Sequence, residues 1–279
     1  MCNIARHFRR IAVCFLITQV TACTTRAPET EAKLKATREY YDSPAVIGVF
    51  LDPSAFGLRK WHATFEMPGP NGKMIDETEY LLRYAKLSKE SKILDWGCGM
   101  GRLVVKLAKK CRCSVTGINI SAKQLDFARL WAKQNGVVEL VSFVLYDGRS
   151  LPFADNSFTN VFSQEALVNA PDKLFAYSQV LRVLKPGGEL SIQDWYADEA
   201  SSDWQKIVRR IDDEHKSTMI TIQESERIFK AVGFKNVEVV DIRSSVPGAL
   251  YRAFPNEVFR EALDKKAFTV GFVHASKPK

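Results

Sequence analysis

The sequence is poor in the residue patterns that mark metal-binding and membrane-spanning proteins. Its six cysteines form no CxxC pair and no cysteine–histidine cluster with zinc spacing, so we expect free thiols and no metal. The apolar run over residues 11–20 is too short for a membrane-spanning helix, which needs about 20 residues. No internal repeat and no low-complexity segment is present, which argues against a solenoid or a disordered chain.

A strong excess of one charge is also missing. The chain has 40 basic and 32 acidic residues, a formal net charge of +8. Leaving out Arg6, Arg9 and Arg10 at the N-terminus lowers the basic count to 37 and the net charge to +5. The remaining lysines and arginines are scattered rather than arranged in stripes, so nucleic acid is not an expected partner.

The first 23 residues have the layout of an export leader. Basic residues come first (MCNIARHFRR), the apolar run follows, and small residues and a cysteine come next, an order typical of a secretory signal. Val20-Thr21-Ala22-Cys23 resembles the bacterial lipobox, whose cysteine is lipidated after cleavage. We therefore expect a signal peptide over residues 1–22 and a membrane-anchored lipoprotein tethered through Cys23. The alternative is an over-extended start or an amphipathic tail, and the chain would then be cytoplasmic.

Residues 23–90 are interpreted as an N-terminal arm. The spacing of apolar residues predicts a helix over residues 29–43. Prolines and glycines make residues 44–73 irregular, and helical spacing resumes over residues 74–88.

From residue 91 to residue 279, strands and helices alternate in the order of βαβ units, which predicts one α/β domain with a mostly parallel sheet. Seven strands are expected, at residues 92–95, 114–120, 141–147, 158–163, 189–195, 236–242 and 268–276. The charged, tryptophan-containing residues 196–220 interrupt the alternation, and we interpret them as a helical insertion over the site.

The stretch ILDWGCGMGRL, residues 93–103, joins the first strand to the first helix through three glycines. Glycines lose much backbone entropy on folding, so their concentration indicates that something approaches the backbone closely here. The dinucleotide fingerprint G-x-G-x-x-G requires glycine or alanine where this chain has Arg102. Pyrophosphate binding, and with it a nicotinamide oxidoreductase, is therefore disfavoured.

Polar residues stand at the predicted carboxyl ends of the strands. They are Asp95, Asn119, Asp147, the segment Ser163–Glu165, and Asp194 with Trp195. Core packing alone would favour apolar residues there. In a doubly wound sheet, ligands bind outside these strand ends, where the strand order reverses.

The motifs ILDWGCGMG, GINISAKQ, DGRSLPFADNSF, SQEAL and VLRVLKPGGELSIQDW together resemble the class I S-adenosylmethionine-dependent methyltransferases. The resemblance covers residues 75–276 and is greatest to the small-molecule group of sterol, tocopherol and sarcosine/dimethylglycine methyltransferases. It implies a Rossmann-like doubly wound fold, S-adenosylmethionine as the methyl donor, and a small-molecule acceptor.

The resemblance also implies a donor site. Its residues would be Asp95, Gly97, Gly99, Gly101, Asn119, Gln124, Asp147, Gly148 and Ser163. In this reading the glycines admit the donor's methionine portion, and Asp147 accepts from the adenine amino group. Asn119 replaces the acid that binds the ribose in many relatives. Other roles stay open, since Asp95 could cap a helix, Gln124 could complete a capping box with Ser121, and Asp147 could be a turn residue.

For catalysis, the relatives that carry a histidine after the fourth strand would place it at Asn169, so that base is missing. Glu165 is the expected catalytic residue beside Gln164, which we expect to orient the substrate. His62, in the arm, is the alternative base.

Tyr40, Tyr41 and Trp195 are expected to line the substrate pocket. The leading hypothesis is methyl transfer to an N, O or C atom of an amine or of a lipid- or isoprenoid-like molecule. The alternative is a membrane-tethered donor-binding protein without catalysis, because Asn119 and Asn169 depart from the family pattern and a cytoplasmic donor is not expected outside the cell.

Overall fold

A computed structural model of the chain describes residues 28–51, 66–68, 73–243, 250, 254 and 256–279. Its central feature is a seven-stranded sheet in the order β5-β4-β3-β6-β7-β9-β8. The strands are β3 (Lys92–Trp96), β4 (Ser114–Asn119), β5 (Val141–Leu145), β6 (Phe158–Gln164), β7 (Leu184–Ala197), β8 (Lys235–Asp241) and β9 (Phe268–Ser276). Only β9 runs antiparallel to its neighbours, so the predicted mostly parallel, Rossmann-like doubly wound α/β fold is confirmed.

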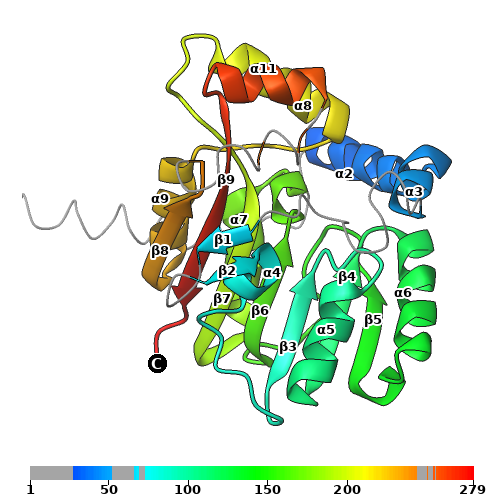
Figure 1. The fold of residues 1–279 in the computed structure, drawn as a ribbon. Coiled ribbons are helices and arrows are strands. Elements are labelled where there is room, and N and C mark those ends of the chain that lie inside the picture. Colours follow the sequence, from blue (N-terminus) through cyan, green and yellow to red (C-terminus); the bar gives the residue numbers. More distant parts are fainter. Residues whose placement is uncertain (1–27, 52–65, 69–72, 244–249, 251–253, 255) are drawn as a thin grey trace, which may run out of the picture.

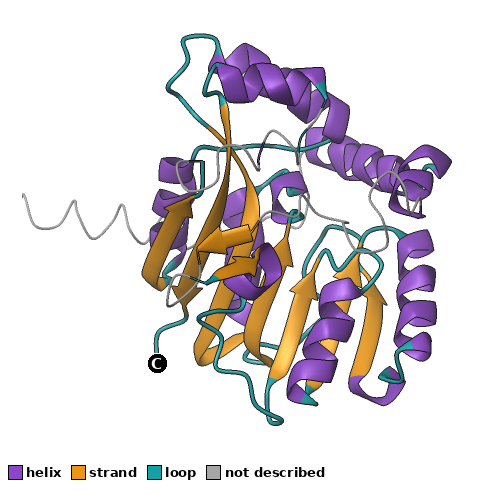
Figure 2. Cartoon of the chain, in the orientation of Figure 1, coloured by secondary structure: helices purple, strands orange, loops and turns teal. Residues whose placement is uncertain are grey.

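Helices cover both faces of this sheet, as Figure 2 shows. They are α5 (Arg102–Cys111), α6 (Ala122–Gln134), α7 (Lys173–Val183) and α9 (Ile222–Val232). The core lies in two clusters because successive residues of a strand point to opposite faces. Ile93 packs in the cluster that contains Val104 of α5, whereas Leu94 packs in the cluster that contains Tyr177 of α7.

The strand order reverses at β3. The chain proceeds from β3 through β4 to β5 at one edge and then returns to place β6 on the other side of β3. The connections that leave the carboxyl ends of the neighbouring strands β3 and β6 therefore run in opposite directions along the sheet. Such a reversal leaves a crevice at these strand ends.

Three helical segments lie over this end of the sheet (Figure 1). Helix α2 (Pro28–Tyr41) comes from the arm, α8 (Trp204–His215) from the insertion, and α11 (Glu257–Asp264) from the segment between β8 and β9. The predicted helices over 29–43 and within 196–220 are thus confirmed.

Other parts of the arm differ from expectation. Residues Pro44–Leu51 form helix α3 instead of an irregular segment, because Pro44 occupies the first helical turn, where proline is well tolerated. Within 74–88, Met74–Asp76 is strand β2, paired antiparallel with β1 (Glu66–Pro68), and only Glu77–Leu81 is helical, as α4. The side chain of Asp76 caps α4 by accepting from the amide of Glu79.

The cysteines also differ from expectation. Cys111 and Cys113 form a disulfide at the end of α5, so the prediction of free thiols was wrong for this pair. The left-handed backbone of Arg112 between them, with φ of +54°, ends the helix and turns the chain back on itself. Cys98 is a buried free thiol.

No helix in the described part of the chain is long and apolar enough to span a bilayer. Within the same residues, no group of three histidine, cysteine or acidic side chains is placed to hold a metal ion. The expected signal peptide, Cys23 and His62 lie outside the described residues.

Candidate active site

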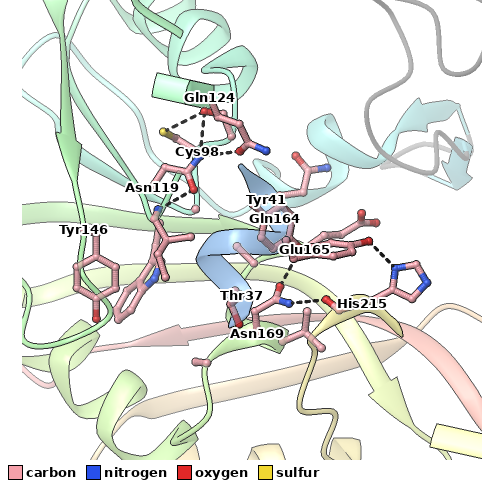
Figure 3. A pocket seen from close by; sticks show the side chains of 18 of the residues that line it. Thr37, Tyr41, Cys98, Asn119, Gln124, Tyr146, Gln164, Glu165, Asn169 and His215 are labelled. Atoms are coloured by element: carbon pink, nitrogen blue, oxygen red, sulfur yellow. Dashed lines mark hydrogen bonds between the residues drawn. The ribbon is translucent and has the colours of Figure 1, made fainter. Parts of the chain in front are cut away.

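A cavity of about 500 Å³ opens at the carboxyl ends of the central strands. Its floor comes from the turn after β3, the ends of β4 and β6, and Trp195 of β7, and helix α2 covers it with Leu34, Thr37, Tyr40 and Tyr41. Figure 3 shows Asn119 and Gln124 on one side of the cavity and Asn169 and His215 on the other. The volume lies within the range of small-molecule sites.

The glycines of the turn after β3 have different surroundings. A Cβ on Gly97 would lie 2.1 Å from Cβ of Ala166, so this lining residue packs tightly against the chain after β6. Gly99 has φ of +53°, and the nearest atom to a Cβ built there would be Oε1 of Gln124, 3.9 Å away. Its backbone is therefore open to the cavity. Gly101 packs against Ala128 of α6 and Phe143 of β5, and it is not among the lining residues. The predicted role in admitting a ligand therefore suits Gly97 and Gly99 as lining residues, but not Gly101.

Asp95, the last residue but one of β3, lines the cavity and is 2% exposed. Asn119 ends β4, and its amide nitrogen donates to Oε1 of Gln124 at 2.7 Å and to the carbonyl of Gly99 at 3.3 Å. Ser121 caps α6 through the amide of Gln124, as predicted, but the Gln124 side chain turns to Asn119 instead of completing the capping box. Nε2 of Gln124 is buried with no hydrogen-bond partner among the described residues.

Two predicted donor residues do not reach the cavity. Asp147 has a side chain that is 60% exposed, and it accepts from the backbone amide of Arg149 at 2.8 Å. Only its neighbours Tyr146 and Gly148 line the cavity. Ser163 is fully buried within the sheet, where its hydroxyl donates to the carbonyl of Trp96 at 3.0 Å. In this structure Asp147 is a turn residue, which is the alternative role considered for it from the sequence. Ser163 links β6 to β3.

The predicted substrate residues do lie together. Tyr40, Tyr41, Gln164, Glu165 and Trp195 all line the cavity. The Gln164 amide donates to Oε1 of Gln193 at 2.8 Å, and the amide of Gln193 donates to Oε1 of Glu165 at 3.1 Å. Glu165 has φ of +51°, a left-handed backbone that holds its side chain at the cavity where β6 ends.

A chain of hydrogen bonds joins the arm to the insertion. The hydroxyl of Tyr41 donates to Oδ1 of Asn169 at 3.2 Å, and Nδ2 of Asn169 donates to the carbonyl of His215 at 3.2 Å. The hydroxyl of Tyr40 lies 3.3 Å from Nδ1 of His215. These contacts fix α2 against the C-terminal end of α8 (Figure 3).

His215 is a lining residue that sequence reasoning missed. It is the last residue of α8, and burial lowers the pKa of its imidazole below the usual 6.5. The only available signal was its place at the end of the inserted segment, which gives no pattern that distinguishes it from a surface residue. Phe254 and Phe259, which also line the cavity, were missed for the same reason.

Two buried groups of opposite charge, Lys173 and Asp194, support the floor of the cavity. The ammonium of Lys173 donates to the carbonyls of Leu167, Val168 and Ala170 at 2.7–2.9 Å. Asp194 accepts from the amides of Val168 and Trp195 at 2.7 and 3.0 Å. Burial lowers the pKa of Lys173 and raises that of Asp194, and the opposite charges counter both shifts. The three carbonyl acceptors require Lys173 to be protonated, and the amide donors to both oxygens of Asp194 favour its ionised carboxylate.

Comparison with known proteins identifies the family. Residues 94–192 match the methyltransferase-domain family. An O-methyltransferase of Aspergillus sclerotiorum is 31% identical over 186 residues, which cover 65% of this chain and 70% of that protein. This chain belongs to the S-adenosylmethionine-dependent methyltransferase family.

A second curated relative and a solved structure are also similar to this methyltransferase chain. The sterol 24-C-methyltransferase of Aspergillus fumigatus is 30% identical over 232 residues, which cover 80% of this chain and 60% of that one. The geranyl diphosphate C-methyltransferase of Streptomyces coelicolor, solved with geranyl diphosphate and S-adenosyl-L-homocysteine, has the same fold. It has a TM-score of 0.72 at 18% identity, and the match covers 90% of this chain and all of that one.

The chain spans only 55% to 60% of the length of the first curated relatives it matches. The chain therefore shares a domain with these relatives, and the shared domain does not assign the activity of a whole relative to this chain.

The cavity fits the donor that the family uses. Asp95, a buried carboxylate, lines the side on which Gly99 leaves its backbone open. Gln124 also lines the cavity, and its buried Nε2 has no hydrogen-bond partner among the described residues. It can donate to a ribose hydroxyl of the donor. Because Asn119 is held by Gln124 and by the Gly99 carbonyl, it is a positioning residue for Gln124 rather than a free donor toward the ligand.

Proposed function

We propose that this chain transfers a methyl group from S-adenosylmethionine to a small, largely apolar acceptor. The proposal rests on one observation. A single cavity has the residues that suit the donor on one side and an aromatic wall with His215 and Glu165 on the other.

The chain's own residues have simple tasks in this reaction. Asp95, the backbone at Gly99 and Nε2 of Gln124 would hold the donor, whose sulfonium supplies an already activated methyl group when bound. Because the group needs no further activation, the protein contributes mainly by orienting two molecules and excluding water. Helix α2 serves the second task, since it covers the cavity with apolar and aromatic side chains.

The cavity wall opposite the donor residues indicates the chemistry of the acceptor. Trp195 contacts Phe254 and Phe259 edge-on, with ring centroids 5.5 and 5.2 Å apart, and all three rings line the cavity. Among the described lining residues, Arg102 is the only arginine or lysine. A diphosphate-bearing acceptor would require more cationic partners than one. We therefore favour a neutral, lipid-, isoprenoid- or aromatic-like acceptor.

Calorimetric titration with S-adenosylhomocysteine tests the donor half of the proposal. We expect wild-type protein to bind, and Asp95→Ala and Gly99→Val to bind at least about tenfold more weakly, a loss of about 1.4 kcal/mol. Asp126→Ala is the control, because that aspartate lies on α6 with a side chain that is 75% exposed. Absence of binding by the wild type, or equal binding by all variants, would contradict the proposal.

A turnover assay tests the second half of the proposal, which is methyl transfer to an acceptor. Purified protein incubated with S-adenosylmethionine and a panel of hydroxyl, amine and isoprenoid compounds should release S-adenosylhomocysteine with at least one of them. Firm donor binding with no release across the panel would instead support the donor-binding protein without catalysis.

A further inference from the structure

His215 has one ring nitrogen with a protein partner and one without. Nδ1 lies 3.3 Å from the Tyr40 hydroxyl, whereas Nε2 is buried with no hydrogen-bond partner among the described residues. The carboxylate of Glu214 comes no nearer to Nε2 than 3.7 Å. A buried ring nitrogen that lines a cavity without a partner indicates a polar atom of a bound molecule.

The ring itself is held firmly. It contacts Trp195 edge-on and Phe259 at a tilt, with ring centroids 5.6 and 5.2 Å away. The residue's carbonyl accepts from Asn169, and the left-handed Lys216 ends the helix directly afterwards. The indole nitrogen of Trp195 is likewise buried without a partner among the described residues. Two rings in contact therefore each leave a buried nitrogen for a ligand.

We propose that His215 is the general base of this methyltransferase and that its acceptor carries a hydroxyl group on an apolar or aromatic skeleton. This inference rests on the proposed function. Tyr40 is the positioning residue, because a proton on Nδ1 donated to the Tyr40 oxygen leaves the lone pair on Nε2.

The step balances. The acceptor's O–H bond breaks as its proton passes to Nε2, and an oxygen lone pair forms the new C–O bond to the methyl carbon. The electron pair of the breaking carbon–sulfur bond stays on sulfur, which becomes a neutral thioether. His215 becomes an imidazolium and returns its proton to water when the site opens.

The surroundings favour a neutral resting imidazole. Burial has the largest effect on the pKa of His215 and lowers it, with Lys216 lowering it further and Glu214 opposing both. The pKa of Tyr40 is raised by burial and by Glu214, so its hydroxyl stays protonated. The groups that face the ring from the other packed elements, Trp195 and Phe259, carry no charge.

Glu165, the catalytic residue expected from the sequence, is less suited to act as the base. One of its carboxylate oxygens already accepts from Gln193 at 3.1 Å, and Gln193 is itself fully buried. We therefore assign Glu165, which directly follows β6, as a substrate-orienting residue rather than the base.

The test uses full-length protein loaded with S-adenosylhomocysteine and labelled with ¹⁵N-histidine, with phenol and anisole as probes. Phenol has a hydroxyl proton to give, and anisole has the same ring without one. We expect phenol to shift the Nε2 resonance of His215 and anisole to leave it unchanged. His215→Gln should lower phenol affinity about tenfold and leave anisole affinity unchanged.

His274→Gln is the matched control. His274 lies in β9, stacks on Tyr84 away from the cavity, and also has its pKa lowered by burial. This variant should keep the wild-type preference for phenol, and it assigns the histidine resonances together with His215→Gln. Tyr40→Phe should change the ratio of the two neutral imidazole tautomers, which a merely structural tyrosine would not do.

The outcomes separate the two proposals. An Nε2 resonance that ignores phenol in protein that binds S-adenosylhomocysteine would overturn the base assignment and leave the proposed function standing. Equal loss of phenol affinity in the His215 and His274 variants would overturn it too. Failure of wild-type protein to bind S-adenosylhomocysteine would remove the proposed function, and the base assignment with it.

Discussion

The backbone at Gly97 combines a positive φ with a tight contact, and the two effects can be separated. Gly97 has φ of +79°, and a Cβ there would lie 2.1 Å from Cβ of Ala166. Gly136 has φ of +66° with nothing within 4 Å. A non-glycine residue in this conformation costs about 1–3 kcal/mol, and overpacking costs about 1–3 kcal/mol more.

We therefore expect Gly97→Ala to lower the free energy of unfolding by about 3 kcal/mol and Gly136→Ala by about 1 kcal/mol. Chemical denaturation of the two variants measures the difference. Equal losses would mean that Ala166 moves aside and that the contact contributes nothing.

The two described histidines predict an acid-sensitive stability. Burial is the main cause that lowers the pKa of both His215 and His274 below 6.5 in the folded state. The unfolded chain then binds more protons below pH 6.5, so the free energy of unfolding falls as the pH falls through that value toward the folded pKa. Above about pH 7 these two residues contribute no slope.

Denaturation midpoints measured between pH 5 and pH 8 test this expectation. The double variant His215→Gln/His274→Gln should show a smaller decrease below pH 6.5 than the wild type. An unchanged decrease would assign the acid sensitivity to other groups.

Single residues also show where sequence reasoning reaches its limit. Asp95 and Gln124 line the cavity, where a strand end and a helix start hold them. Asp147 does not line it, since the sequence places it at a strand end but does not determine that its side chain turns to the Arg149 amide. His215 depends on how α8 lies over the sheet, which the local pattern does not encode.

At the scale of elements, helix α2 contributes to the site although it lies outside the alternating strands and helices of residues 91–279. Its inner face contributes Leu34, whose side chain packs directly on Gly148. Its outer face carries the exposed pair Lys35 and Glu39, with side chains 75% and 67% exposed. The sheet keeps its own two core clusters, so α2 should detach without unfolding the domain.

We expect Leu34→Asp to release α2, because a carboxylate buried against Gly148 without a partner is strongly unfavourable. Affinity for S-adenosylhomocysteine should fall at least about tenfold, since the cavity loses its cover. Cleavage by trypsin at Lys35 and Arg38 should accelerate. The global unfolding transition should move less than it does in Gly97→Ala.

Glu39→Ala serves as the control on the same helix and should change neither binding nor proteolysis. If Leu34→Asp binds S-adenosylhomocysteine like the wild type, α2 is not part of the donor site.

Elements were predictable where a repeated pattern defined them. The seven strands and the helices between them follow from alternating apolar runs, caps and glycine turns, and the structure confirms them. The arm has no such pattern. The sequence predicts an irregular segment at Pro44, although Pro44 starts helix α3, and the short β2 lies in a segment with helical spacing. Both depend on tertiary contacts that local sequence does not express.

At the scale of the whole molecule, the apolar cavity lies beneath α2, the first described helix of the chain. Helix α2 begins at Pro28, only five residues after Cys23, and those five steps span at most about 18 Å. A lipid on Cys23 would therefore hold the cavity near a bilayer surface. An apolar acceptor drawn from that bilayer would suit the aromatic wall around Trp195.

We propose on this basis that Cys23 is the lipidated residue, because the basic leader, the apolar run and Val20-Thr21-Ala22-Cys23 follow the lipoprotein order. Full-length chain produced in a bacterial host and grown with an alkyne-labelled fatty acid should incorporate the label and partition with membranes. Cys23→Ser should lose both properties, whereas Cys14→Ser, within the apolar run, should keep them. Label that persists in Cys23→Ser, or a mature mass that still includes residues 1–22, would refute the anchor. The acceptor search would then turn from membrane lipids to compounds dissolved in the cytoplasm, where the methyl donor is made.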